Sequence, residues 1–315
     1  MTLQARPIDR PTLAILCAVL GALAFSLNDS LVKLLSAGYA LPQIIFFRSS
    51  IAFLIVVFLI VSWDVGLRAL WSRKWGLLVL RGSFVVAANI SFFTGIAAMP
   101  LADGTALFFV APLLITVLSV FVLRERVGPR RLLAVVVGLI GVLIIMRPGI
   151  GVFQFAALLP IIAACFYASL HMLTRILGST ESASVMAAYI QATVMVFMGL
   201  LGVLFGDGRF AETDNPSLAF LFRPWVWPQG FDLAIMVFLG VLNGASGVLI
   251  SQAYRIAPAA TVAPFEYVSL VMAIIYGYLF FAEIPDGMTW VGIVLIAGSG
   301  LYVLWREQRV KFSRR

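Results

Sequence analysis

The chain has 315 residues, of which 62% are hydrophobic and only 11% are charged, and its mean hydropathy is +1.07. A soluble globular domain is about 45–50% apolar and about 25% charged, so this composition excludes an ordinary soluble enzyme or binding domain. The net charge of +8 could indicate a nucleic-acid partner, but Lys and Arg lie almost entirely between apolar runs. We therefore expect contact with membrane lipids and no nucleic acid.

Ten apolar stretches approach the roughly 20 residues that a transmembrane helix needs. In chain order they run near Pro11–Leu34, Pro42–Ser62, Trp75–Ile96, Ala102–Leu123, Arg131–Met146, Phe153–Thr174, Ser184–Phe205, Phe231–Ser251, Ala259–Phe280 and Met288–Trp305. The longest connection, Asp207–Gly230, contains prolines and tryptophans and is predicted to be an interfacial loop. The sequence thus predicts an all-α integral membrane protein with ten transmembrane helices.

The positive charges predict the orientation of these spans. Sixteen of the 22 Lys and Arg residues fall on the side that holds the N-terminus, four fall on the other side, and Arg48 and Arg81 lie within spans. Because cytoplasmic loops carry the excess of Lys and Arg, both termini are expected in the cytoplasm. Cys17 and Cys165 both fall inside apolar runs, so we expect no disulfide framework, no metal and no cofactor.

Two pairs of segments indicate an internal repeat. Residues 100–125 align without a gap on residues 258–283, which lays Phe109 on Tyr267 and Glu125 on Glu283. Residues 22–35 align on 164–177, which lays Asp29 on His171 and Lys33 on Arg175. Each half would have five spans, so the second would be inverted, as in many secondary transporters. The alternative is that two apolar helical segments align passably by chance.

The ten spans, the five-plus-five layout and the glutamates Glu125 and Glu283 resemble the drug/metabolite transporter superfamily with two EamA-type repeats. Residues 26–33 and 43–48 resemble the bacterial branch that includes S-adenosylmethionine uptake proteins, which is also similar to riboflavin and carboxylate carriers. The resemblance implies a first repeat over 11–147, a second over 153–305 and a basic cytoplasmic tail over 306–315. It also implies a bacterial inner-membrane protein that works as a monomer or a homodimer.

Charged residues inside the first two spans form a candidate polar cluster. An ionisable group near the bilayer centre costs about 2.5–3.5 kcal/mol on insertion scales, so it is expected to face a cavity or a partner. Asp29 and Lys33 lie four residues apart on one helix face, close enough to pair, and Arg48 lies at a similar depth. Alternatively, Lys33 reaches the outer headgroups and Asp29 only neutralises Arg48.

Two later residues are candidates for proton coupling. Glu266 lies about two turns inside the ninth span, where it could couple protons, bind a cationic substrate or accept hydrogen bonds from a neighbouring helix. His171, the only histidine, lies at a comparable depth, so a His171–Glu266 pair could titrate near neutral pH. Alternatively, His171 is only hydrogen-bonded to a neighbouring group.

Uncharged candidates complete the predicted substrate site. Four aromatic residues could pack against a planar or cationic ligand, and two mid-span amides need polar partners; they are Phe108, Phe109, Tyr167, Tyr267, Asn89 and Asn243. Packing between helices is the alternative role for each of them. Arg81 is expected to snorkel, Glu125 and Glu283 to stabilise helix N-termini, and the span prolines to permit kinks at Pro112, Pro160 and Pro264.

The sequence therefore predicts a secondary transporter that moves a small polar or zwitterionic, amino-acid-like metabolite, such as S-adenosylmethionine, by alternating access. A carrier of riboflavin, a carboxylate or a drug is the alternative. The chain has no Gly-x-x-x-x-Gly-Lys-Ser/Thr loop, which argues against direct ATP coupling. One histidine and short loops make a membrane-embedded transferase a weaker hypothesis, and the polar residues within the spans argue against a non-transporting subunit.

Overall fold

The computed structural model describes residues 11–123, 128–147, 155–177, 180–256 and 259–312, and within these ranges the chain contains helices and no strand. The helix Leu41–Ile55 (α2) continues through a π-helical segment, Val56–Val61, into the helix Ser62–Asp64 (α3). The α-helices in chain order are α1 (Pro11–Leu35), α2 (Leu41–Ile55), α3 (Ser62–Asp64), α4 (Trp75–Ala97), α5 (Leu101–Phe108), α6 (Ala111–Leu123), α7 (Pro129–Met146), α8 (Leu158–Leu177), α9 (Ala183–Phe205), α10 (Pro216–Phe222), α11 (Phe231–Ile256), α12 (Ala259–Glu266), α13 (Val268–Phe281) and α14 (Gly287–Phe312).

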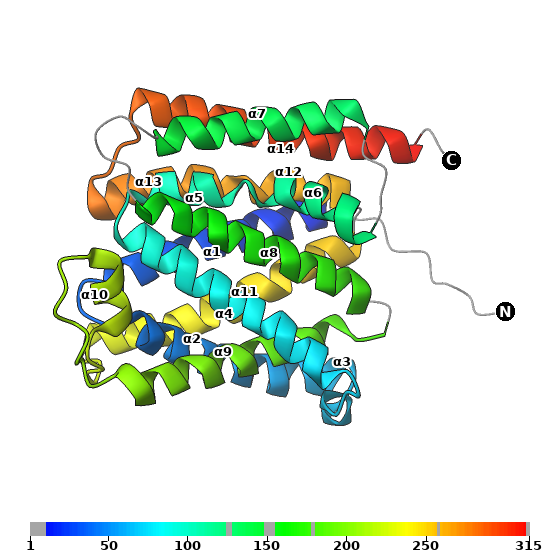
Figure 1. The fold of residues 1–315 in the computed structure, drawn as a ribbon. Helices are drawn as coiled ribbons and strands as arrows, with labels where there is room; N and C mark the ends of the chain where they lie inside the picture. The colour runs from blue at the N-terminus through cyan, green and yellow to red at the C-terminus, as the bar shows by residue number, and fades with distance from the viewer. Residues whose placement is uncertain (1–10, 124–127, 148–154, 178–179, 257–258, 313–315) are drawn as a thin grey trace.

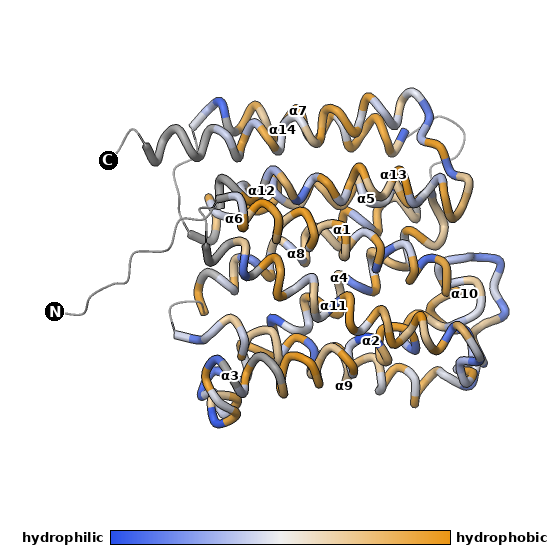
Figure 2. The backbone as a smooth tube through the Cα atoms, turned by 180° about the vertical axis from the view of Figure 1, so that it is seen from behind, coloured by the Kyte–Doolittle hydropathy of each residue, from blue (hydrophilic) through white to orange (hydrophobic). Residues whose placement is uncertain are grey.

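Most of these helices are apolar along their length. Seven described stretches are long and apolar enough to cross a membrane, and three shorter apolar ones cover Leu132–Met146, Leu158–Thr174 and Gly287–Val303. Figure 2 shows apolar residues along most of each helix, with the hydrophilic stretches gathered mainly toward the two ends of the bundle. The chain is therefore an α-helical, multi-pass membrane protein.

The helices run roughly side by side in layers. In Figure 1, α7 and α14 form a pair at the top, the short helices α5, α6, α12 and α13 lie below them, and α2 and α9 lie at the bottom. α7 and α14 approach closely because both carry a glycine at the contact. A Cβ on Gly141 would lie 2.9 Å from the backbone oxygen of Gly292, and the reverse distance is the same.

The start of α1 and the end of α14 lie at the same end of the bundle, on the right in Figure 1. We call this the termini end. The opposite end holds the end of α1, the start of α14 and the short helix α10.

Contacts between helices follow the same pattern in both halves of the chain. α1 packs against α11, α12 and α13, and α8 packs correspondingly against α4, α5 and α6. α2 contacts α9 and α11, while α9 contacts α2 and α4. Exchanging the first half of the chain with the second maps the contact between α2 and α9 onto itself and each of the others onto another observed contact.

Two spans are broken at matching positions. The fourth breaks at Phe109 and Val110, between α5 and α6, and the ninth breaks at Tyr267, between α12 and α13. Pro112 supplies a physical reason for the first break, because it lacks the N–H that would bind the carbonyl of Phe108. Pro264 lies inside α12, one turn before the second break.

The third proline behaves differently from its predicted role. Pro160 falls in the first turn of α8, where backbone N–H groups have no partner within the helix, so α8 continues without a break.

Candidate functional site

A buried arginine lies at the centre of the polar residues. Arg48, in α2, is 5% exposed, and its Nη2 donates a hydrogen bond to Oδ1 of Asn89 in α4 at 2.7 Å. The amide nitrogen of Asn89 donates to the carbonyl of Val85 at 2.8 Å, which turns the amide oxygen toward Arg48. The guanidinium also lies 5.4 Å from the centre of the Phe93 ring. A neutral amide and an aromatic face thus hold the cation in place.

Asp29 lies within electrostatic reach of this arginine and forms no direct contact with it. Its carboxylate accepts a hydrogen bond from the Asn28 amide at 3.2 Å. Within the part of the chain that the structure describes, no ion pair joins Asp29 to Arg48, and the buried Nε of Arg48 has no hydrogen-bond partner. A carboxylate and a guanidinium with a free N–H can bind the two opposite charges of one small molecule.

A continuous row of rings leads from Arg48 to His171. Phe93 contacts Phe92 at 5.3 Å between ring centres, and Phe92 contacts Phe108 at 5.2 Å. Phe108 contacts Tyr167 at 5.3 Å, and Tyr167 contacts His171 at 4.5 Å. The structure therefore brings three predicted residues, Phe108, Tyr167 and His171, into one row that Phe92 and Phe93 join to the arginine.

Phe92 and Phe93 were absent from the predicted site. The sequence contains a signal for Phe93, since it follows Asn89 by four residues and so shares its helix face.

Tyr167 contacts one of the two groups predicted to couple protons and lies within electrostatic reach of the other. His171 contacts its ring, and Glu266 lies within electrostatic reach of the Tyr167 and Tyr267 hydroxyl groups. Glu266 is the last residue of α12, directly before the helix break at Tyr267. In the described ranges, no group of three or more His, Cys, Asp or Glu side chains is placed to hold a metal ion.

Three other predicted residues lie outside the cluster formed by Arg48, Asn89, Phe93 and Asp29, which we call the Arg48 cluster. Phe109 and Tyr267 contact each other at the two helix breaks, with ring centres 4.9 Å apart. Asn243, in α11, accepts a hydrogen bond from the Ser246 hydroxyl through its backbone carbonyl at 3.2 Å. Among the described residues, no hydrogen bond joins the Asn243 side chain to Arg48 or Asp29.

Both predictions made for Lys33 are wrong. It neither pairs with Asp29 nor reaches the headgroups, because its Nζ donates to Glu283 Oε1 at 2.6 Å, to Glu283 Oε2 at 2.9 Å and to the Met99 carbonyl at 2.8 Å. Glu283 was expected to stabilise a helix N-terminus. It does so for α5 rather than for the following α14, by accepting from the Leu101 N–H at 2.8 Å. Glu125, its predicted counterpart, lies outside the described residues.

Arg81 also departs from its predicted role. It points into the protein instead of snorkelling, since its Nε donates to Thr174 Oγ1 at 2.8 Å and its Nη1 donates to the Met186 carbonyl at 3.1 Å. These bonds tie α4 to α8 and α9. They also place a cation within electrostatic reach of His171.

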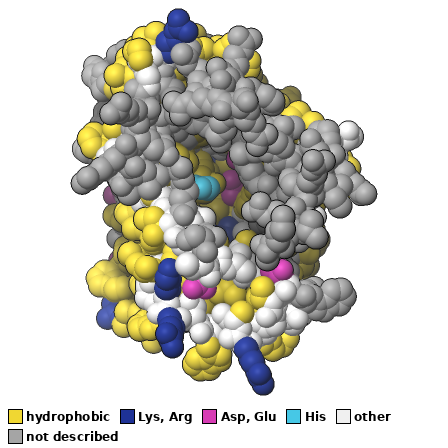
Figure 3. Space-filling view, turned by 90° about the vertical axis from the view of Figure 1, so that its right-hand side faces the viewer, with side chains coloured by type: hydrophobic (Ala, Val, Ile, Leu, Met, Phe, Trp, Pro, Cys, Tyr) yellow, Lys and Arg dark blue, Asp and Glu magenta, His cyan; other side chains and the backbone are white. Residues whose placement is uncertain are grey.

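Seen from the termini end, the surface is hollowed, and a histidine and acidic side chains lie inside the hollow (Figure 3). Because the chain has one histidine, the side chain in view belongs to His171. At the opposite end, the buried contact between Lys33 and Glu283 joins α1 to the turn before α14.

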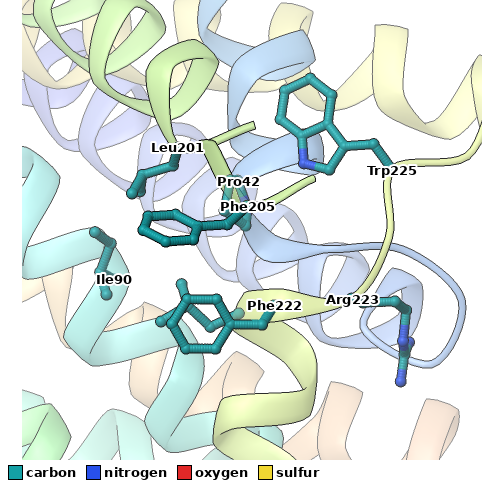
Figure 4. Close-up of a pocket in the computed structure, with 8 residues that line it drawn as sticks. Pro42, Ile90, Leu201, Phe205, Phe222, Arg223 and Trp225 are labelled. Carbon is teal, nitrogen blue, oxygen red and sulfur yellow. The ribbon is translucent and has the colours of Figure 1, made fainter. Parts of the chain in front are cut away.

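A separate apolar cavity lies near the opposite end. It has a volume of about 150 Å³ and is formed by side chains of α2, α4, α9, α10 and the segment that follows α10; they are Pro42, Ile90, Leu201, Phe205, Leu221, Phe222, Arg223 and Trp225. Figure 4 shows the rings of Phe205 and Phe222 facing this space, while Arg223 points away from it. This cavity carries none of the predicted site residues.

The profile of the EamA-like transporter family matches residues 12–147 and again residues 154–305. The chain belongs to this family. Its relatives include a riboflavin transporter of Vibrio cholerae, which is 30% identical and aligns over 93% of this chain and 92% of its own length. An S-adenosylmethionine uptake transporter of Rickettsia prowazekii is 27% identical, with 94% of each chain covered.

A pseudopaline exporter of Pseudomonas aeruginosa is 26% identical over 90% of this chain and 92% of its own. One solved crystal structure shares the fold with a TM-score of 0.63 at 19% identity, covering 94% of this chain and 97% of the other. These findings confirm the resemblance drawn from the sequence. The names within the EamA family are those of transporters, and they differ in substrate and in direction.

Proposed function

We propose that this protein is a secondary carrier that moves a small zwitterionic or polar, amino-acid-like metabolite across the bacterial inner membrane. The observation that carries the proposal is the pair of opposed charges in the Arg48 cluster. Arg48 is buried against the amide of Asn89 rather than against a carboxylate, its Nε has no hydrogen-bond partner, and Asp29 lies within electrostatic reach of it. A ligand with one anionic and one cationic group complements both charges at once.

The proposal includes ten spans arranged as two inverted five-helix repeats. It is supported by the three shorter apolar helices, which coincide with the three further spans expected from the sequence. The exchange of contacts between the two halves and the paired breaks at Phe109 and Tyr267 also support it. Both termini are placed in the cytoplasm, because the excess of Lys and Arg falls on that side.

Alternating access then gives the two ends of the bundle opposite roles. The hollow at the termini end would be the cytoplasmic route to the site. At the opposite end, the ion pair between Lys33 and Glu283 joins α1 to the turn before α14. Glu266 and His171 flank Tyr167 and are the proposed proton-coupling groups. No catalytic step or cofactor is part of this mechanism.

Riboflavin is the second candidate substrate. The row of rings from Phe93 to Tyr167 offers flat faces on which a planar heterocycle can stack. Three relatives that are named riboflavin transporters favour the same substrate. A planar substrate would use the rings more than it would use the opposed charges of Arg48 and Asp29.

The test is counterflow into proteoliposomes against a pool of S-adenosylmethionine, riboflavin, amino acids and dicarboxylates, read by mass spectrometry. Protein-free liposomes provide the control. Selective accumulation of S-adenosylmethionine or an amino acid supports the proposal. Selective accumulation of riboflavin favours the second candidate, and no accumulation with folded protein contradicts the carrier function for every member of the pool.

A further inference from the structure

One buried ion pair joins three separate parts of the chain at the opposite end of the bundle. Lys33 belongs to the last turns of α1, and Glu283 lies in the turn between α13 and α14. Their hydrogen bonds extend to the carbonyl of Met99, just before α5, and to the N–H of Leu101, the first residue of α5. The Lys33 side chain is 8% exposed and that of Glu283 is 24% exposed.

The hydrogen bonding of this pair is close to complete. The ammonium of Lys33 donates to two carboxylate oxygens and one carbonyl, while Glu283 Oε2 also accepts from a backbone N–H. A buried ion pair compensates its desolvation only with such additional hydrogen bonds, and removing one partner leaves an uncompensated charge. The Lys33 ammonium also lies 4.7 Å from the centre of the Phe281 ring.

The pair lies on the same helix face as the proposed substrate site. Asp29 precedes Lys33 by four residues on α1, so a single turn of helix separates the carboxylate that faces Arg48 from the ammonium that binds Glu283. A shift of α1 caused by binding at Asp29 would therefore reach Lys33 directly. In the same turn of α1, the Asn28 side-chain amide donates a hydrogen bond to the Asp29 carboxylate.

We propose that the ion pair between Lys33 and Glu283 is the closure of the opposite end, and that it must break for this end to open. The inference rests on the proposed carrier function and deepens it, because it assigns one contact to one half of the transport cycle. Since α1 and the turn before α14 come from different halves of the chain, separating the two residues separates the halves at this end.

The test measures the width of the opposite end without using any substrate. Spin labels are attached at Leu34→Cys and Met288→Cys, whose native side chains are 39% and 50% exposed, in protein that also carries Cys17→Ser and Cys165→Ser. Double electron–electron resonance in proteoliposomes then reports the distance between α1 and α14. The background protein should give one short distance.

Lys33→Met and Glu283→Gln should each add a longer distance, wider by about 5 Å or more, the scale of a one-turn helix displacement. The population of this wider state should rise at least about tenfold over that of the background protein. Glu283→Gln keeps an acceptor for the Leu101 N–H and is the variant of choice if Lys33→Met does not fold. A single short distance in folded Glu283→Gln overturns the proposal.

The matched control is Arg147→Gln, which removes a second ion pair at the same end. Arg147 binds Asp286, but these side chains are 34% and 55% exposed, and they join α7 to α14, which pack together as a pair. The control should keep the short distance, and an equal widening there would contradict a specific role for Lys33. Because the measurement needs no transport, widening without counterflow supports the closure while contradicting the carrier function.

Discussion

The rings of Phe109 and Tyr267 lie against each other, with centres 4.9 Å apart, at the points where the two broken spans are interrupted. The gapless alignment of residues 100–125 with 258–283 lays these two residues on each other. The breaks of the two halves therefore meet in the structure. Irregular backbone at membrane depth is tolerated where protein or a water-filled cavity surrounds it, and the ring contact supplies part of that surrounding.

Gly300→Ala should destabilise the protein through Tyr267. A methyl group at Gly300 would collide with the Tyr267 hydroxyl, and overpacking of this kind costs about 1–3 kcal/mol. Tyr267→Phe alone should change stability little, because the hydroxyl is buried without a hydrogen-bond partner. Thermal unfolding of the two single variants and the double variant tests this. The double variant should recover most of the loss, and strictly additive losses would show that the collision is not the cause.

Asn89→Asp should abolish transport while keeping the fold. The new carboxylate would bind the Arg48 guanidinium, which lies 2.7 Å from the present amide oxygen, and would compete with an anionic group of the substrate. Counterflow and thermal unfolding together check this. Asn89→Gln, which keeps a neutral amide, is the matched control and should lose much less flux. Normal flux in Asn89→Asp would remove Arg48 from the binding site.

Glu266→Gln should make flux independent of pH if Glu266 couples protons. The carboxylate lies near the hydroxyl groups of Tyr167 and Tyr267, and the neutral amide retains its shape without its ability to ionise. Flux is measured across a pH series in proteoliposomes for the wild type and the variant. His171→Gln, measured in parallel, separates the two candidate groups. A pH dependence that survives in Glu266→Gln assigns the coupling elsewhere.

The ion pair between Arg147 and Asp286 should contribute to stability only above acidic pH. The hydrogen bond from Arg147, followed by that from the Thr289 N–H, holds the pKa of Asp286 below its ordinary value of 3.8. A lowered carboxylate pKa stabilises the folded state above the unfolded pKa, and this advantage is lost as the pH falls below it. Since both side chains are partly exposed, we expect the ion pair to contribute about 0.2–1 kcal/mol to the free energy of unfolding.

Thermal unfolding of the wild type and Arg147→Gln checks this. The two proteins should differ near neutral pH, and the difference should shrink at about pH 3, where the carboxylate is protonated in the unfolded chain. An undiminished difference at low pH would mean that Arg147 acts through its packing instead.

The sequence predicts the helical fold well because hydropathy and charge are local signals. Runs of apolar residues predicted spans near the observed helices, and of the three prolines predicted to permit kinks, Pro112 and Pro264 lie close to observed breaks. The sequence could not show at which residues the spans break, or that Pro160 lies in the first turn of α8 and does not interrupt it. The effect of a proline depends on which turn of the helix it occupies.

Pairings between distant helices were harder to predict. Asp29 and Arg48 were predicted to lie at a similar depth, and Asn89 was predicted to need a polar partner. The partner of Lys33 was not predicted, since Glu283 lies 250 residues away. A signal was present: the two alignments lay Lys33 on Arg175 and Glu283 on Glu125, so that each half repeats one basic and one acidic residue. The contact itself depends on how the halves pack, which no local pattern contains.

Counterflow by wild-type and Arg48→Gln protein in the same metabolite pool tests the central claim most directly. The account predicts that wild-type proteoliposomes accumulate a zwitterionic or anionic metabolite, and that Arg48→Gln loses this flux by at least about a hundredfold, the scale of one lost charge-assisted contact of about 3 kcal/mol. Near-normal flux of the same compound through folded Arg48→Gln would contradict it, and would leave the buried arginine a structural role only.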